Sequence, residues 1–275
     1  MRAEVARLCG AGGEVSDEEL VYKENRRVDA ALLEQLRSQN SWAVFIRDTE
    51  TCDEFAAEVR WNCEYVMKEK AQERNVTSND GSGSDAHRDT NHDGWTLERF
   101  AQEPPAVKAL LTQAEVGALR LYTSSTFRLI NGPLRCRIKP HPLAFTTLLI
   151  SQALKKLRAN NMAGKKFHTQ YLWRGMKNRV VNEDFLLKGG AEMACMSTTS
   201  DLDIVASYAR SHTPLLFRIK VDSPMELGAN IQWLSMFPGE AEVLFPPLTY
   251  LKPMFQQEIR GGFGSVITLK PSFPT

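Results

Sequence analysis

The spacing of apolar positions changes near residue 167, and this change predicts helices before that point and strands after it. Broken apolar stripes at helical spacing lie within residues 16–38, 53–74, 107–122 and 143–157. Short β-prone runs follow at 167–173, 193–198, 214–221, 241–245, 248–252 and 264–270. One more helix is expected from Asp201 onward, with Ser200 as its N-cap. Helices followed by strands are typical of an α+β fold, which is the class we expect.

A polar stretch interrupts the helical half of the chain. Residues 76–94 are rich in Asn, Asp, Ser and Gly, a composition typical of a loop or linker. We therefore divide the chain into an N-terminal helical lead segment (1–75), a polar linker or loop (76–100) and a main domain (101–275).

The same stretch contains half of a metal-binding pattern. Asp89, Asn91 and Asp93 place oxygen ligands at alternate positions, and a glycine follows, as in the first half of a calcium loop. The twelfth position of that loop is Phe100 where a glutamate belongs. The pattern fits either a calcium loop or a hydrated Asn/Asp turn. We favour the turn and expect that the protein requires no metal.

Charge and composition exclude several classes of protein. The formal net charge of the 275 residues is +1, which gives no bias toward nucleic acid or an anionic membrane surface. No apolar run reaches the roughly eighteen residues of a membrane span, and no signal peptide is evident. The five cysteines are scattered without metal-type spacing. We expect a cytoplasmic or otherwise intracellular monomer.

Two glutamates one residue apart are the strongest candidates for chemistry. Glu240 and Glu242 stand between a Phe-Pro-Gly turn and an apolar Val-Leu-Phe run that ends at Pro246 and Pro247. Side chains alternate faces along a strand, so we expect both carboxylates to point to the same face, with Ala241 on the other. A solvated acidic edge strand is one interpretation. The aromatic turn before the pair and the apolar run after it favour carboxylates held at a cleft.

Two segments upstream carry further polar residues at the ends of apolar runs. Tyr171-Leu-Trp-Arg-Gly-Met places Arg174 and Gly175 at the end of the first run, and Ala194-Cys-Met-Ser-Thr-Thr-Ser places Ser197 at the end of the second. A third segment, Tyr122 to Arg135, includes Asn131. An arginine, a serine and Glu-x-Glu follow one another in this order, and the order is more specific than any one motif.

These motifs resemble those of the arginine–serine–glutamate class of NAD-dependent mono-ADP-ribosyltransferases, which contains arginine-specific vertebrate enzymes and several clostridial-type toxins. The resemblance covers roughly Glu115 to Phe273. It implies a helical lobe followed by two packed, mainly antiparallel β-sheets around an NAD cleft, with 101–275 as the catalytic domain. The family pattern is usually Ser-Thr-Ser, whereas this chain has Ser197-Thr198-Thr199.

The resemblance also implies roles for the residues. Glu242 matches the family glutamate that stabilises the oxocarbenium-like cation formed when NAD loses nicotinamide, and Ser197 donates to it. Glu240 activates an arginine acceptor, whose guanidinium has a pKa above about 12 and needs a carboxylate to become nucleophilic. Phe237 is expected to contact the acceptor protein or to pack in the turn. The residues expected at NAD are Arg174, Gly175, Ser197, Tyr122, Asn131 and Arg135.

The implied activity is transfer of ADP-ribose from NAD to arginine on an acceptor protein. The alternatives are an NAD glycohydrolase and a non-catalytic NAD-binding module. Modification of a nucleic-acid base is a third alternative, but the sequence shows no basic aromatic groove that would support it. Tyr208, on the helix after Ser197, is expected to pack in the core rather than to stack on nicotinamide.

Overall fold

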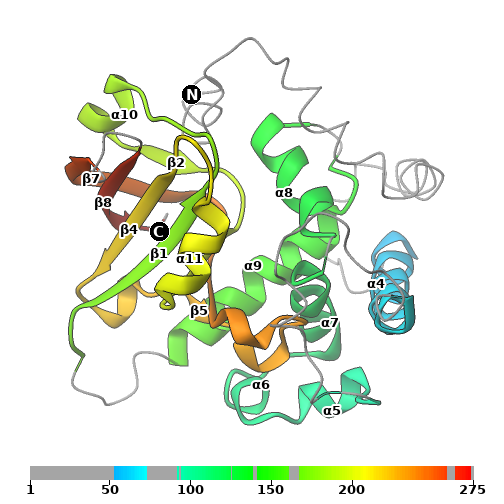
Figure 1. Ribbon diagram of the computed structural model, residues 1–275. Coiled ribbons are helices and arrows are strands. Elements are labelled where there is room, and N and C mark those ends of the chain that lie inside the picture. Colours follow the sequence, from blue (N-terminus) through cyan, green and yellow to red (C-terminus); the bar gives the residue numbers. More distant parts are fainter. Residues whose placement is uncertain are drawn as a thin grey trace.

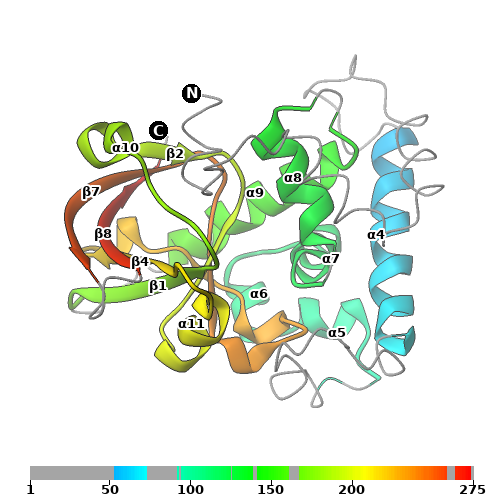
Figure 2. The ribbon, with the colours of Figure 1, turned by 45° about the horizontal axis from the view of Figure 1, so that its top comes forward.

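A computed structural model describes residues 53–72, 92, 94–124, 126–138, 141–160, 167–258 and 264–273. Helices α4 to α9 form one side of the molecule, and the strands form the other together with α10 and α11 (Figure 1). Helix α4 lies at the edge opposite strand β7 in both ribbon views (Figures 1 and 2). The helix predicted for 16–38 lies outside the described residues. The longer helices are α4 (Asp53–Gln72), α7 (Gln113–Tyr122), α8 (Phe127–Cys136), α9 (Ala144–Ala159) and α11 (Leu202–Ala209).

The α+β class is confirmed: within the described residues, eight strands form one sheet of order β2-β7-β8-β4-β1-β3-β6-β5. All neighbours pair antiparallel except β4 and β8, which are parallel. The two expected sheets are joined into one, because the Trp173–Thr199 pair links β1 to β3. The strands are β1 (Gln170–Met176), β2 (Gly190–Glu192), β3 (Met196–Thr199), β4 (Leu215–Val221), β5 (Ala229–Asn230), β6 (Glu242–Phe245), β7 (Thr249–Glu258) and β8 (Ser265–Ser272).

The single helix predicted for 107–122 is wrong, because the chain breaks there. Residues Pro104–Lys108 form the short helix α6, and Leu110 then takes a left-handed backbone with φ of 52°. Thr112 starts α7 through a capping box: its hydroxyl accepts from the N–H of Glu115, whose carboxylate accepts from the N–H of Thr112. Three further helices of the described residues were not predicted: α5 (Leu97–Ala101), α8 and the short α10 (Glu183–Lys188).

Helix α4 is tied to the start of α9 by a buried polar network. No side chain within α9 caps its first turn. Instead the carboxylate of Glu58 accepts hydrogen bonds from the N–H groups of Phe145 and Thr146, at 3.4 and 2.6 Å. Asn62 also bonds the Thr146 hydroxyl. A residue far away in the chain therefore satisfies the N–H groups that a helix start leaves unpaired. Burial raises the pKa of Glu58 to about 7, against the hydrogen bonds from Thr146 and Phe145, which lower it.

Two apolar cores lie on the two sides of the molecule. One packs α7, α8 and α9 together with Leu234, Met236 and Leu244 from the segment that surrounds the glutamate pair. The other fills one face of the sheet around Phe217 and Ile219 of β4. Helix α5 (Leu97–Ala101) starts within the predicted 76–100 linker and contributes Leu97 and Phe100 to the helical core. The division into three segments stays a prediction.

Candidate active site

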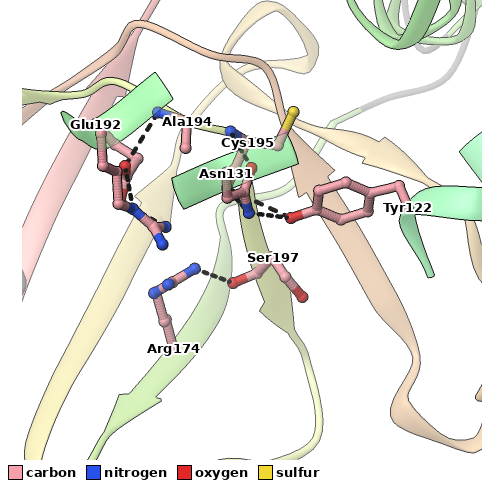
Figure 3. Close-up of polar contacts among 8 residues, drawn as sticks. Tyr122, Asn131, Arg174, Glu192, Ala194, Cys195 and Ser197 are labelled. Carbon is pink, nitrogen blue, oxygen red and sulfur yellow. Dashed lines mark hydrogen bonds and ion pairs between the residues drawn. The ribbon is translucent and has the colours of Figure 1, made fainter. Parts of the chain in front are cut away.

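The arginine of the first motif lies on β1, in the middle of the sheet. The guanidinium of Arg174 donates to the carbonyl of Ser197 at 3.2 Å, so it joins β1 to β3 (Figure 3). Its neighbour Gly175 faces helix α11: a Cβ there would lie 2.5 Å from the Val205 carbonyl oxygen and 3.0 Å from the Ala209 nitrogen. Only glycine permits this close approach, which places α11 directly on β1.

Ser197 and Glu242 lie on the paired strands β3 and β6. Thr199 pairs with Glu242, and Ser197 stands two residues earlier on β3. Glu242 is buried, with 7% of its surface exposed. Burial raises the pKa of its carboxyl group to about 7; a hydrogen bond from Ser197 lowers the pKa, the nearby charge of Glu240 raises it, and Arg174 lowers it. The structure thus brings Arg174, Ser197 and Glu242 together.

The expectation that Glu240 shares a strand face with Glu242 is wrong. Glu240 ends the 3-10 turn Pro238–Glu240, and the strand starts only at Glu242. Between them Ala241 has a left-handed backbone with φ of 48° and ends the turn, so the alternation of a strand does not extend back to Glu240. Glu240 is half-buried on this turn, and the charges of the two glutamates still interact.

The expectation that Tyr208 packs in the core is wrong, because 49% of its surface is exposed. Its hydroxyl donates to Oε1 of Glu240 at 2.6 Å. Burial of the hydroxyl end, together with Glu240 and Glu242, raises the pKa of Tyr208 above its usual value. No sequence motif pointed to this contact, since the two residues come from different elements.

The prediction that Ser200 caps the helix is also wrong, by one residue. Asp201 caps α11, and its carboxylate accepts from the N–H groups of Asp203 and Ile204 at 2.8 and 3.4 Å. Ser200 is exposed. Phe237, in the turn before Glu240, is partly buried against the helical core.

Tyr122 and Asn131 are buried and bind the backbone of Cys195, just before β3 (Figure 3). The amide of Asn131 donates to the Cys195 carbonyl at 3.2 Å and accepts from the Cys195 N–H at 3.2 Å. It also donates to the Tyr122 hydroxyl at 3.0 Å. These contacts fix the chain two residues before Ser197, where the helical side meets the sheet.

Glu192, at the end of β2, is a site residue that sequence reasoning missed. Arg135 donates to both of its carboxylate oxygens, at 3.0 and 3.3 Å, and the N–H of Ala194 donates to Oε1 at 3.1 Å. Burial alone would raise the pKa of Glu192, but the charges of Arg135 and Arg174 and these hydrogen bonds lower it below the usual value. The ionised carboxylate is therefore paired with Arg135 and is stabilised further by the charge of Arg174. An acidic residue just before the serine segment was the only signal in the sequence.

The proposed calcium ligands Asp89, Asn91 and Asp93 lie outside the described residues. Within the described ranges, no group of three or more His, Cys, Asp or Glu side chains is placed to hold a metal ion. In those ranges, too, no helix combines the length and the apolar character that a membrane crossing requires.

The chain belongs to the ADP-ribosyltransferase exoenzyme family, whose model matches residues 93–252, more than half of its length. It is therefore a transferase, and NAD is the substrate that donates ADP-ribose.

Solved structures of bacterial ADP-ribosyltransferases resemble the chain at low identity. HopU1 of Pseudomonas syringae pv. tomato DC3000 is 16% identical, with a TM-score of 0.49, over 64% of this chain and 86% of that one. Exoenzyme S of Pseudomonas aeruginosa, solved with human 14-3-3 protein beta and carba-NAD, is 15% identical, with a TM-score of 0.48, over 77% and 88%. The Clostridium limosum C3 exoenzyme is 20% identical, with a TM-score of 0.47, over 68% and 97%. A comparison with curated proteins gives no match.

Proposed function

We propose that the protein transfers ADP-ribose from NAD to arginine side chains of an acceptor protein and releases nicotinamide. The pair of carboxylates is the observation that supports this most. Glu242 is buried beside Arg174 and Ser197, and Glu240 is half-buried on the turn before it. One carboxylate suffices to promote loss of nicotinamide. A second, more exposed one is what a guanidinium acceptor requires.

In the proposed reaction, the N-glycosidic bond between nicotinamide and C1′ of its ribose breaks, and the electron pair leaves with nicotinamide, which departs neutral. Positive charge develops on the ribose as in glycoside cleavage. The ionised carboxylate of Glu242 stabilises this cation, and the hydroxyl of Ser197 orients that carboxylate. A guanidinium nitrogen of the acceptor then gives its proton to Glu240 and forms the new bond to C1′.

The remaining residues are proposed to bind NAD or to support the residues that bind it. Arg174 and Arg135 present planar guanidinium groups suited to the pyrophosphate and ribose of NAD. Arg135 pairs with Glu192, and the charge of Arg174 acts on the same carboxylate. Gly175 follows Arg174 and keeps α11 against β1. Tyr122 and Asn131 support the site through the Cys195 backbone.

Phe237 is the residue we assign to the acceptor protein, together with Glu240. It lies three positions before Glu240, and its partly buried ring leaves some surface for contact. The acceptor itself, the intracellular location and the monomeric state stay proposals.

The test is to measure NAD turnover with and without agmatine, a small guanidino acceptor, for the native chain, Glu240→Gln and Glu242→Gln. The native protein should label agmatine. Glu240→Gln should lose transfer and keep some hydrolysis of NAD, whereas Glu242→Gln should lose both by about a hundred- to thousandfold.

Two outcomes would contradict the proposal. If nicotinamide is released at the same rate without agmatine and no agmatine is labelled, the protein is an NAD glycohydrolase. If NAD binds but is not consumed, the protein is a binding module.

A further inference from the structure

Helix α11 brings a hydroxyl group to the outer glutamate of the site. The Tyr208 hydroxyl donates to Oε1 of Glu240 at 2.6 Å, across 32 positions of sequence. A hydrogen bond from a hydroxyl to an ionised carboxylate is short and about twice as strong as one between neutral groups. The contact therefore fixes the direction of the Glu240 side chain.

The donor, Tyr208, lies on helix α11, which packs firmly against the sheet. Helix α11 buries Ile204, Val205 and Ala209, and its backbone lies against Gly175 of β1. Asp201 caps its first turn. The position of the Tyr208 hydroxyl is thus set by the same strand that carries Arg174.

The acceptor of the bond lies on a turn whose backbone is held separately. The N–H of Glu240 donates to the Phe237 carbonyl at 3.0 Å, and the Gln232 amide donates to the Pro238 carbonyl at 2.8 Å. These bonds place the backbone of the turn, whereas the bond from Tyr208 acts on the carboxylate itself.

We infer that Tyr208 is a positioning residue that aims the Glu240 carboxylate at the acceptor, so that it governs ADP-ribose transfer rather than NAD cleavage. This inference rests on the proposed function. An ionised carboxylate has about four acceptor sites, so the bond from Tyr208 and bonds to a guanidinium can coexist. Because Glu240 and burial raise the pKa of Tyr208, its hydroxyl keeps its proton and stays a donor.

The test compares Tyr208→Phe, which removes only the hydroxyl, with Tyr171→Phe as a matched control. Tyr171 is exposed to a similar degree, 44% against 49%, and lies on β1 beside Arg218. In Tyr208→Phe, kcat for agmatine labelling should fall about tenfold. The rate of NAD hydrolysis without agmatine and the KM for NAD should both stay within about twofold of the native values. Tyr171→Phe should leave all three unchanged. An equal loss of transfer and hydrolysis would overturn the inference, and so would no loss of either.

A second measurement separates this inference from the proposed function. In protein labelled with carboxyl-¹³C glutamate, the Glu240 signal is assigned from its absence in Glu240→Gln and titrated by NMR. Loss of the hydrogen bond should raise the pKa of Glu240 in Tyr208→Phe relative to native protein, with Glu242 as the neighbouring charge in both. An unchanged titration would overturn the inference. If the native chain labels no agmatine, the proposed function fails, and this titration alone decides whether Tyr208 positions Glu240.

Discussion

Two glutamates two positions apart in the sequence lie in different surroundings, which suits them to the separate roles that we propose. Glu242 is buried on a strand, where burial raises its pKa to about 7 and Ser197 and Arg174 oppose the rise. Glu240 lies on a half-buried turn with a tyrosine as donor. Carboxyl groups whose environments differ in this way can perform different tasks in one reaction.

The rate of nicotinamide release should therefore depend on pH near neutrality. Glu242 must be ionised to stabilise the ribose cation, so the rate should rise as pH increases through about 7 and then level off. In Ser197→Ala the hydrogen bond that lowers the pKa is lost, so the midpoint should move to higher pH. Initial rates between pH 5 and 9 measure this.

The neighbouring exposed serine gives the control for that profile. Ser200→Ala should keep the native midpoint, because Ser200 is exposed and three residues from Ser197. A native profile that is flat across pH 7, or an unmoved midpoint in Ser197→Ala, would contradict the assignment of Glu242.

At the scale of elements, polar side chains from outside α9 bind the backbone at its start. Glu58 of α4 satisfies the first N–H groups of α9. His141 links α8 to the start of α9 as a neutral ring: its Nδ1 accepts from the N–H of Leu143, so its Nε2 donates to the Ile130 carbonyl. Burial lowers the pKa of His141, against the contact with the Ile130 carbonyl, which raises it.

Removal of the Glu58 side chain should destabilise the fold through α9. Glu58→Ala leaves the N–H groups of Phe145 and Thr146 buried without an acceptor, which typically costs about 1–3 kcal/mol. Arg60→Ala, at an exposed position of the same helix, should change the free energy of unfolding by less than about 0.5 kcal/mol. Urea unfolding of both variants measures the difference. Equal stability of the two would show that α4 does not cap α9.

At the scale of the whole molecule, α9 connects the helical side to the last strand. Arg158 donates to the carbonyls of Leu227 and Met225, at 2.9 and 2.8 Å. Its guanidinium also lies 3.5 Å from the ring centroid of Phe273, and that ring stacks on Phe245 at the end of β6. The strand that begins with Glu242 is therefore supported at its far end by a helix.

Arg158→Ala should lower the free energy of unfolding by about 1–3 kcal/mol, because two carbonyls lose a charged donor and a cation–π contact is lost. Lys155→Ala, exposed on the same helix, serves as the control and should change it by less than about 0.5 kcal/mol. If thermal unfolding shows the same midpoint for both variants, Arg158 does not join the two sides.

The sequence predicts the parts of the site that local motifs carry. Arg174, Ser197 and Glu242 each end or begin a β-prone run, and the structure brings them together. Glu240 was misplaced because face alternation holds only within a strand, whereas the Pro-Gly turn continues through Glu240 to a left-handed Ala241.

Contacts between residues far apart in the chain could not be predicted from the sequence. Glu192 is recognisable only once Arg135, 57 positions earlier, is beside it. The parallel pairing of β4 with β8 joins segments about fifty residues apart, and no local pattern indicates it. The Tyr208–Glu240 bond depends on the same kind of long-range packing.

The most direct test of the account is to incubate the protein with NAD and three peptides that differ only in one central residue, arginine, lysine or glutamine. Mass spectrometry then reads the ADP-ribose added to each. The account predicts addition to the arginine peptide alone, and its loss in Glu240→Gln. Labelling of the glutamine or lysine peptide, or labelling that survives Glu240→Gln, would contradict arginine as the acceptor and Glu240 as the residue that activates it.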